Sequence, residues 1–167
     1  MAVSPDDFRG ALGSWASGVT VVTTELDGLM YGITVSSFAS LSLDPPLITV
    51  SLANDNRLPS MIEQSGHFAV SILADDQREI SLHFAQPGRV PATAFGHPVP
   101  TRRWTTGSPL IEGAVAQVDC ELEQSVPGGD HTIMIGRVTG AHSDPGKLPL
   151  VYFRRDYRSL GEVNNGG

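Results

Sequence analysis

Two adjacent prolines, Pro45 and Pro46, interrupt the most strand-like part of the sequence and limit how the chain can fold there. Before them, apolar and small residues alternate over residues 31–35, which predicts a β-strand. Proline lacks an amide donor and forces extended geometry on the residue before it, so this strand must end and a new apolar strand must begin at residues 47–52. The turn between them is rich in hydroxyl groups, with serines at positions 36, 37, 40 and 42.

This serine-rich turn has two interpretations. Backbone amides in a turn form a concavity that binds anions, and small side chains leave room for a phosphate or a polar, planar ring. Alternatively, the serines hydrogen-bond only to the turn itself, as such loops often do. The pattern alone leaves both interpretations open.

Composition narrows the class of protein. A chain of 167 residues with 40% hydrophobic residues suits one globular domain, which we place at residues 1–160, followed by a flexible tail at 161–167. The net charge of −7 argues against nucleic acid as a partner. The single cysteine excludes an internal disulfide, and neither a membrane-spanning apolar run nor a secretory signal is evident. We therefore expect a cytoplasmic protein that does not contact the membrane.

The distribution of turn residues favours short strands over a helical bundle. The 18 glycines and 12 prolines punctuate the chain, and Asp27-Gly28 marks a hairpin. Residues 116–123 alternate, so that Cys120 falls on the apolar face of a strand as a buried thiol. About seven strands and three short helices are expected, which predicts a closed antiparallel barrel with helices plugging its ends.

The N-terminus is predicted to form a helix. Ser4 caps it, Pro5 occupies the first helical position, and the pattern ends near Gly18. Phe8 and Trp15 belong to an apolar stripe, which we expect to pack on the body of the domain.

Chemically reactive side chains form no recognisable constellation in the sequence. There is no phosphate-binding glycine loop, no nucleophile elbow and no Cys or His pair at zinc spacing, so no metal site is predicted. Arg57 either binds a phosphate or is solvated, and His83 and His97 are lone histidines around the long loop 85–100. His131 stands at the mouth of a hairpin. A borrowed cofactor held by backbone and hydroxyl groups fits this pattern best.

Five stretches, each weak alone, together resemble the short-chain flavin reductases, the reductase components of two-component flavin-dependent monooxygenases. They cover nearly the whole chain in a specific order and spacing. The stretches are 17–24 (SGVTVVTT), 32–46 (GITVSSFASLSLDPP), 65–70 (SGHFAV) with Gln77 and Phe84-Ala85, 129–132 (GDHT) with 136–138 (GRV), and 149–153 (PLVYF) with Tyr157-Arg158.

The resemblance implies a mainly β fold, namely a split β-barrel of antiparallel, Greek-key type with a few short helices. It further implies a homodimer with one FAD or FMN site per subunit near the interface, and hydride transfer from NADH or NADPH. His131 would face the nicotinamide. The residues implied at the flavin are Thr34, Val35, Ser36, Ser37, Ser40, Ser51, Leu52, Ala53, Asn56, Arg57, Phe84, Ala85 and Arg89.

One position departs from the family pattern. Where the family often has a serine and a threonine flanking the arginine, this chain has Asn56 and Leu58. Asn56 can donate a hydrogen bond to a phosphate, whereas Leu58 cannot. The phosphate contacts, and with them the choice between FAD and FMN, are therefore left open.

We expect an NAD(P)H:flavin oxidoreductase that passes reduced flavin to a separate monooxygenase. Two alternatives share the barrel: a non-catalytic flavin carrier, and an oxidase of the pyridoxamine-phosphate type. The oxidase needs a basic pocket for its substrate phosphate, and a total of 11 Lys plus Arg makes that pocket less favoured. A purely structural module is the remaining alternative, because fold alone does not fix function.

Overall fold

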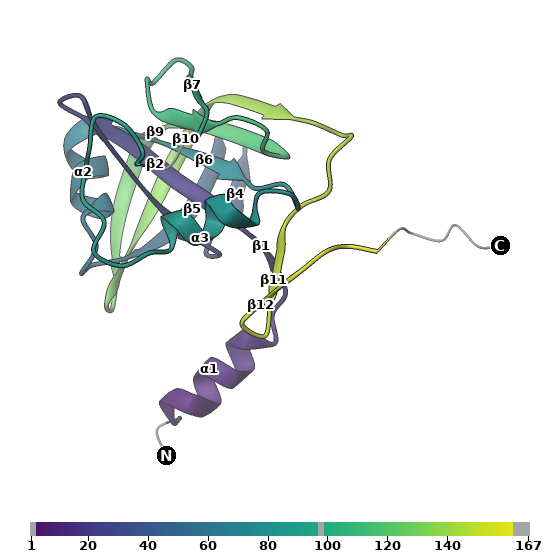
Figure 1. Cartoon of the computed structure of the whole chain (residues 1–167). Helices are drawn as coiled ribbons and strands as arrows, with labels where there is room; N and C mark the ends of the chain where they lie inside the picture. The colour runs from purple at the N-terminus through teal and green to yellow at the C-terminus, as the bar shows by residue number, and fades with distance from the viewer. Residues whose placement is uncertain (1–2, 97–98, 162–167) are drawn as a thin grey trace.

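A computed structural model of the chain describes residues 3–96 and 99–161. Within these ranges the chain forms twelve strands and three helices (Figure 1). The helices are α1 (Pro5–Gly13), α2 (Leu58–Ser65) and α3 (Arg78–Phe84). The strands are β1 (Ser17–Gly18), β2 (Thr20–Leu26), β3 (Leu29–Val35), β4 (Ala39–Leu43), β5 (Pro46–Ala53), β6 (His67–Ile72), β7 (Thr101–Arg103), β8 (Pro109–Ile111), β9 (Ala116–Gly128), β10 (His131–Ser143), β11 (Val151–Phe153) and β12 (Asp156–Arg158).

Seven of these strands form one antiparallel sheet in the order β3-β2-β6-β9-β10-β5-β4. The sheet confirms the predicted split barrel, although β3 and β4 are not paired with each other in the described structure, so the barrel is open along that line. Two small sheets, β1-β11-β12 and β7-β8, account for the strands beyond the seven that the sequence predicts. Non-sequential neighbours such as β2 and β6 bring distant parts of the chain together at the barrel wall.

The barrel is filled by apolar side chains from alternating strand positions. Leu52, Phe68 and Met134 are fully buried in one cluster, and Cys120 lies there too, as predicted. Burial raises the pKa of the Cys120 thiol to about 12, which makes it inert as a nucleophile. Gly136 is required by this packing, because a Cβ at that position would lie 2.5 Å from the Phe68 ring.

Helices α2 and α3 lie against the barrel. Helix α2 buries Leu58 and Ile62 among other residues, and Gly66 caps its C-terminus with a φ of 76°, the left-handed conformation that glycine favours. Helix α3 buries Ser81 and Phe84, and Phe84 joins a second apolar cluster. None of the helices in the described ranges has the length and apolarity needed to cross a membrane.

Helix α1 corrects a sequence expectation. Its cap is as predicted, because the Asp7 amide donates to Ser4 Oγ at 3.1 Å, but the helix ends at Gly13 and not near Gly18. Its stripe does not pack on the body: Phe8 and Trp15 are 53% and 77% exposed. Figure 1 shows α1 pointing away from the barrel. An apolar stripe identifies a buried face but not the surface that covers it.

Candidate flavin site

The serine-rich turn ends β3 and is tied to β5 by a reciprocal pair of hydrogen bonds. Ser37 Oγ donates to the Ser51 carbonyl at 2.7 Å, and the Ser51 amide donates to Ser37 Oγ at 3.2 Å. The hydroxyl of Ser37 therefore shapes the turn, as the self-bonding interpretation requires. The ligand-facing groups expected from this turn are its amides and the neighbouring Ser36.

A cavity of about 180 Å³ opens beside this turn. The Thr34 hydroxyl donates to the Ser81 carbonyl at 2.7 Å, and Ser81 Oγ lies 2.8 Å from the Tyr157 hydroxyl, so α3, β3 and β12 are joined at its wall. The cavity is lined by four residues predicted at the flavin, Thr34, Val35, Ser36 and Ala85, and by Val19, Ser81, Tyr152 and Tyr157.

A second part of the site runs along β5 towards β10. Ser51 and Ala53 are half-buried on one face of the strand, whereas Leu52 between them is fully buried in the core. Because successive strand residues point to opposite faces, Leu52 can offer a ligand only its backbone. Ala53 pairs with His131, which places the backbone of His131 about two residues, or roughly 7 Å, along the sheet from Ser51.

His131 is held by its sequence neighbour. Its Nδ1 lies 2.7 Å from Asp130 Oδ1, and the imidazole remains 45% exposed. The hydrogen bond from His131 lowers the pKa of the Asp130 carboxyl. A carboxylate on Nδ1 orients the ring and directs Nε2 outwards.

Arg89 is engaged within the fold. Its Nη1 donates to the Gly32 carbonyl at 2.8 Å, and its guanidinium lies 4.5 Å from the centroid of the Phe84 ring. Burial lowers the pKa of Arg89 from its usual very high value, which leaves it charged. Phe84 itself is 1% exposed, so its side chain packs in the core and only its backbone can reach a ligand.

The other predicted residues lie towards the start of α2 and on β4. Asn56 Oδ1 accepts from the Leu58 amide at 2.9 Å just before α2, while Arg57, the N-cap residue, is exposed. Ser40 pairs with Ile48, whose side chain is buried in the core. Directly paired residues share a sheet face, so Ser40 lies on the face of Ile48 and Ser51 lies on the opposite face of the sheet.

Local sequence patterns did not identify the aromatic residues around the cavity. Tyr152 and Tyr157 come from the β11–β12 hairpin, and Arg154 and Arg155 form its turn. Both tyrosines entered the sequence analysis only within the stretches that carry the family resemblance. Among the lone histidines, His83 packs edge-on to Phe84, and His97 lies outside the described residues.

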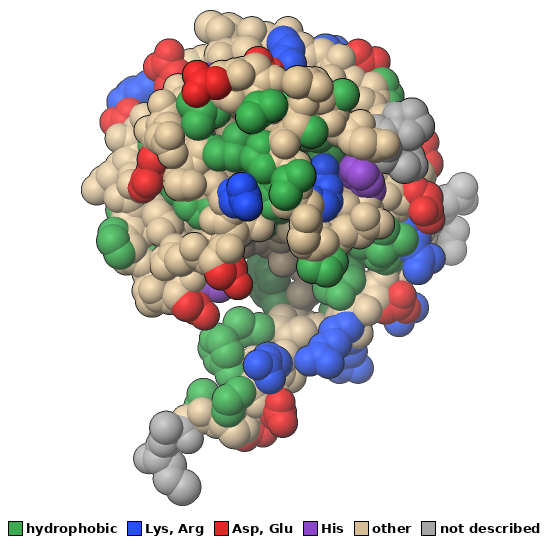
Figure 2. Space-filling view, turned by 60° about the vertical axis from the view of Figure 1, so that its left-hand side comes forward, with side chains coloured by type: hydrophobic (Ala, Val, Ile, Leu, Met, Phe, Trp, Pro, Cys, Tyr) green, Lys and Arg blue, Asp and Glu red, His purple; other side chains and the backbone are tan. Residues whose placement is uncertain are grey.

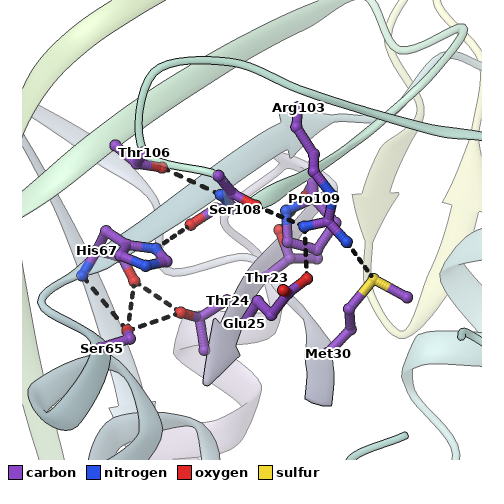
Figure 3. A network of polar contacts seen from close by, with 11 residues as sticks. Thr23, Thr24, Glu25, Met30, Ser65, His67, Arg103, Thr106, Ser108 and Pro109 are labelled. Atoms are coloured by element: carbon purple, nitrogen blue, oxygen red, sulfur yellow. Dashed lines mark hydrogen bonds and ion pairs between the residues drawn. The ribbon is translucent and has the colours of Figure 1, made fainter. Parts of the chain in front are cut away.

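A separate polar network, shown in Figure 3, lies on the β2, β6 and β8 side of the barrel. His67 Nδ1 lies 2.6 Å from Ser108 Oγ, and Arg103 forms an ion pair with Glu25 at 2.5 Å. Ser108 is fully buried, so this Ser–His pair cannot act as an accessible nucleophile. The network fastens residues 101–111 to the barrel wall.

Comparison with known proteins decides the family. Residues 12–161 match the family described as flavin reductase like domain. The chain belongs to this flavin reductase family. The fold described above is therefore that of a flavin reductase-like domain.

Relatives of this flavin reductase-like chain agree along nearly the whole length. An NADH-dependent flavin reductase of Rhodococcus sp. is 41% identical over 95% of this chain and 88% of that protein. The reductase component of a 4-hydroxyphenylacetate 3-monooxygenase of Thermus thermophilus is 38% identical over 92% and 95% of the two chains. The solved structure of the Streptomyces globisporus NADH:FAD oxidoreductase SgcE6, in complex with NAD and FAD fragments, is 31% identical, with a TM-score of 0.89 over 99% of each chain.

Proposed function

We propose that this protein is an NAD(P)H:flavin oxidoreductase that reduces FAD or FMN and supplies reduced flavin to a separate monooxygenase. The observation that carries the proposal is the alignment of the turn after β3 with the β5 face and His131. Ser37 is bonded to Ser51, and Ala53 pairs with His131, so amides, small side chains and an imidazole follow one another along a single surface. The named activities of the relatives support it.

The residues present fit a flavin. Ser36, Ser37, Ala53 and Ala85 are small, which leaves space for a flat ring system, and the adjacent amides offer donors to its polar edge. A bound flavin would supply the redox chemistry, accepting a hydride from the nicotinamide donor. The chain contributes binding and orientation, which can lower the barrier by several kcal/mol.

We assign a role to each part of the candidate site. The backbone of 34–37 and the exposed atoms of Ser51 and Ala53 hold the ring. Asn56 and Arg57, at the start of α2, are assigned to the phosphate, whereas Arg89 supports β3 by donating to the Gly32 carbonyl. His131 positions the nicotinamide and need not transfer a proton.

We also place two copies of the chain in a homodimer. The apolar stripe on α1 is uncovered, and on the edge strand β4 Leu43 is 92% exposed, so both surfaces are suited to burial against a second copy. Size-exclusion chromatography with light scattering tests the dimer: a monomer at micromolar concentration would contradict it.

We further propose that the protein works in the cytoplasm. The free, buried thiol of Cys120 is compatible with that reducing environment.

Steady-state NADH oxidation tests the function. Purified protein is assayed with FAD, FMN or riboflavin added in turn, and with NADPH in place of NADH. Turnover that saturates with added flavin supports a reductase that uses flavin as a substrate. Flavin retained through purification without NADH turnover would contradict the proposal and favour a carrier.

A further inference from the structure

The β11–β12 hairpin turn is unusual in its residues. Arg154 and Arg155 occupy both central positions with φ of 49° and 62°, the left-handed region that hairpin turns normally fill with asparagine and glycine. Both arginines adopt this strained backbone at the point where the hairpin meets α1: the Arg154 amide donates to the Gly13 carbonyl at 2.9 Å. The fold therefore places two arginine side chains at positions where the backbone conformation of the turn disfavours arginine.

This turn lines a second cavity, of about 400 Å³, next to the proposed flavin site. The two cavities share Ser36 and Tyr152, so a ligand whose ring lies beside Ser36 can extend from one into the other. Trp15 forms part of the second cavity and is largely exposed. Figure 2 shows the surface hollowed between the barrel and the protruding part formed by α1 and the hairpin, with Lys or Arg side chains beside the hollow.

The charges around this cavity favour an anion. The Arg154 guanidinium lies 5.0 Å from the Phe153 ring centroid, and neither Arg154 nor Arg155 forms an ion pair within the described ranges. Two acidic residues near the turn, within the described part of the chain, already have partners: Asp6 pairs with Arg9 at 3.3 Å and Asp156 pairs with Arg158 at 3.2 Å. Two uncompensated guanidinium groups thus stand at the rim in a chain whose net charge is −7.

We propose that this cavity takes part of a dinucleotide, that the Arg154–Arg155 turn binds its phosphates, and that the Trp15 indole is available to its adenine base. Guanidinium groups bind phosphate oxygens through paired, charge-assisted hydrogen bonds, and an exposed indole offers a stacking face. The proposal rests on the proposed function, since the ring end of the ligand is placed beside Ser36. The diphosphate can belong to FAD or to the nicotinamide donor, and the test separates these sources.

The test variant replaces Arg154→Asn together with Arg155→Gly. Asn-Gly is the pair that this turn geometry favours, so the variant removes both charges while easing the backbone, and folding failure is not expected. The control is Arg158→Gln, which removes a paired arginine from the same hairpin outside the turn. Dissociation constants for FAD, FMN and riboflavin are measured by flavin fluorescence, and those for NADH, NADPH and ADP by calorimetry.

Loss of the turn arginines is expected to weaken a phosphate-bearing ligand about tenfold or more, the scale of a charged hydrogen bond, while riboflavin changes less than twofold. Weakening confined to FAD assigns the diphosphate to the flavin, and weakening of NADH and ADP assigns it to the nicotinamide donor. Unchanged constants for every ligand, or riboflavin weakened as much as FAD, would overturn the proposal. The binding measurements need no turnover, so a protein that binds phosphates here but never oxidises NADH would refute only the proposed function.

Discussion

Ser37 and Ser51 hold each other through one hydroxyl, which donates to the Ser51 carbonyl and accepts from the Ser51 amide. The pair joins the turn after β3 to β5 at the point where the flavin ring is proposed to lie. It satisfies two backbone groups at once, so a single side chain fixes the spacing between the turn amides and the β5 face.

Ser37→Ala should therefore weaken flavin binding indirectly, because the lost hydroxyl bonds to the Ser51 backbone and not to the flavin. Two backbone groups of Ser51 lose their partner, and we expect a loss of stability of about 1 kcal/mol with a several-fold rise in the flavin dissociation constant. Fluorescence titration and urea unfolding measure the two effects. Ser143→Ala, at the exposed end of β10, is the control. Wild-type affinity in the Ser37 variant would show that the turn does not need this pair.

Arg89→Ala distinguishes two roles for Arg89, namely support of the fold and binding of the flavin phosphate. The side chain donates to the Gly32 carbonyl and lies over Phe84, so its loss should lower the stability of the flavin-free protein by about 1–3 kcal/mol. Urea unfolding of flavin-free protein measures this, with exposed Arg57→Ala as the comparison. If flavin-free stability is unchanged while FMN binding is lost, Arg89 binds the phosphate and its contact with Gly32 is incidental.

Local patterns in the sequence predicted the local features of the fold. The Ser4 cap and the Asp27-Gly28 hairpin depend on neighbouring residues, and both occur as expected. Strand alternation also placed Cys120 in the core. The same alternation could have excluded the Leu52 side chain from the flavin site, because Ser51 and Ala53 on either side point the other way.

Features that depend on distant contacts were not predictable in this way. Arg89 bonds to a carbonyl 57 residues away, and no local pattern marks that pairing. The stripe on α1 signals a buried face, but its partner surface is not encoded in the helix itself. The Tyr152 and Tyr157 walls of the cavity depend on where the β11–β12 hairpin docks, which follows from the assembled barrel.

His67 makes stability depend on pH. Burial lowers its pKa below the usual 6.5, against weaker opposing effects of Asp119 and Glu25. The unfolded chain then binds a proton more readily than the folded one, so this contribution is fully present above pH 6.5 and is lost as the pH falls from 6.5 towards the folded pKa. The urea midpoint should drop over that range. His67→Gln should flatten the drop, and an unaltered slope would assign it to other groups.

The contact between Asp130 and His131 predicts how strongly each of these residues affects the KM for NADH. If the carboxylate orients the imidazole, Asp130→Asn should raise the KM for NADH several-fold, because an amide binds Nδ1 less strongly than a carboxylate does. His131→Ala should raise it further, while the flavin dissociation constants stay near the wild-type values in both variants. Steady-state kinetics at saturating flavin measures the effect, and Asp144→Asn, a turn carboxylate away from the site, is the control. Equal KM values in all four proteins would remove His131 from the nicotinamide site.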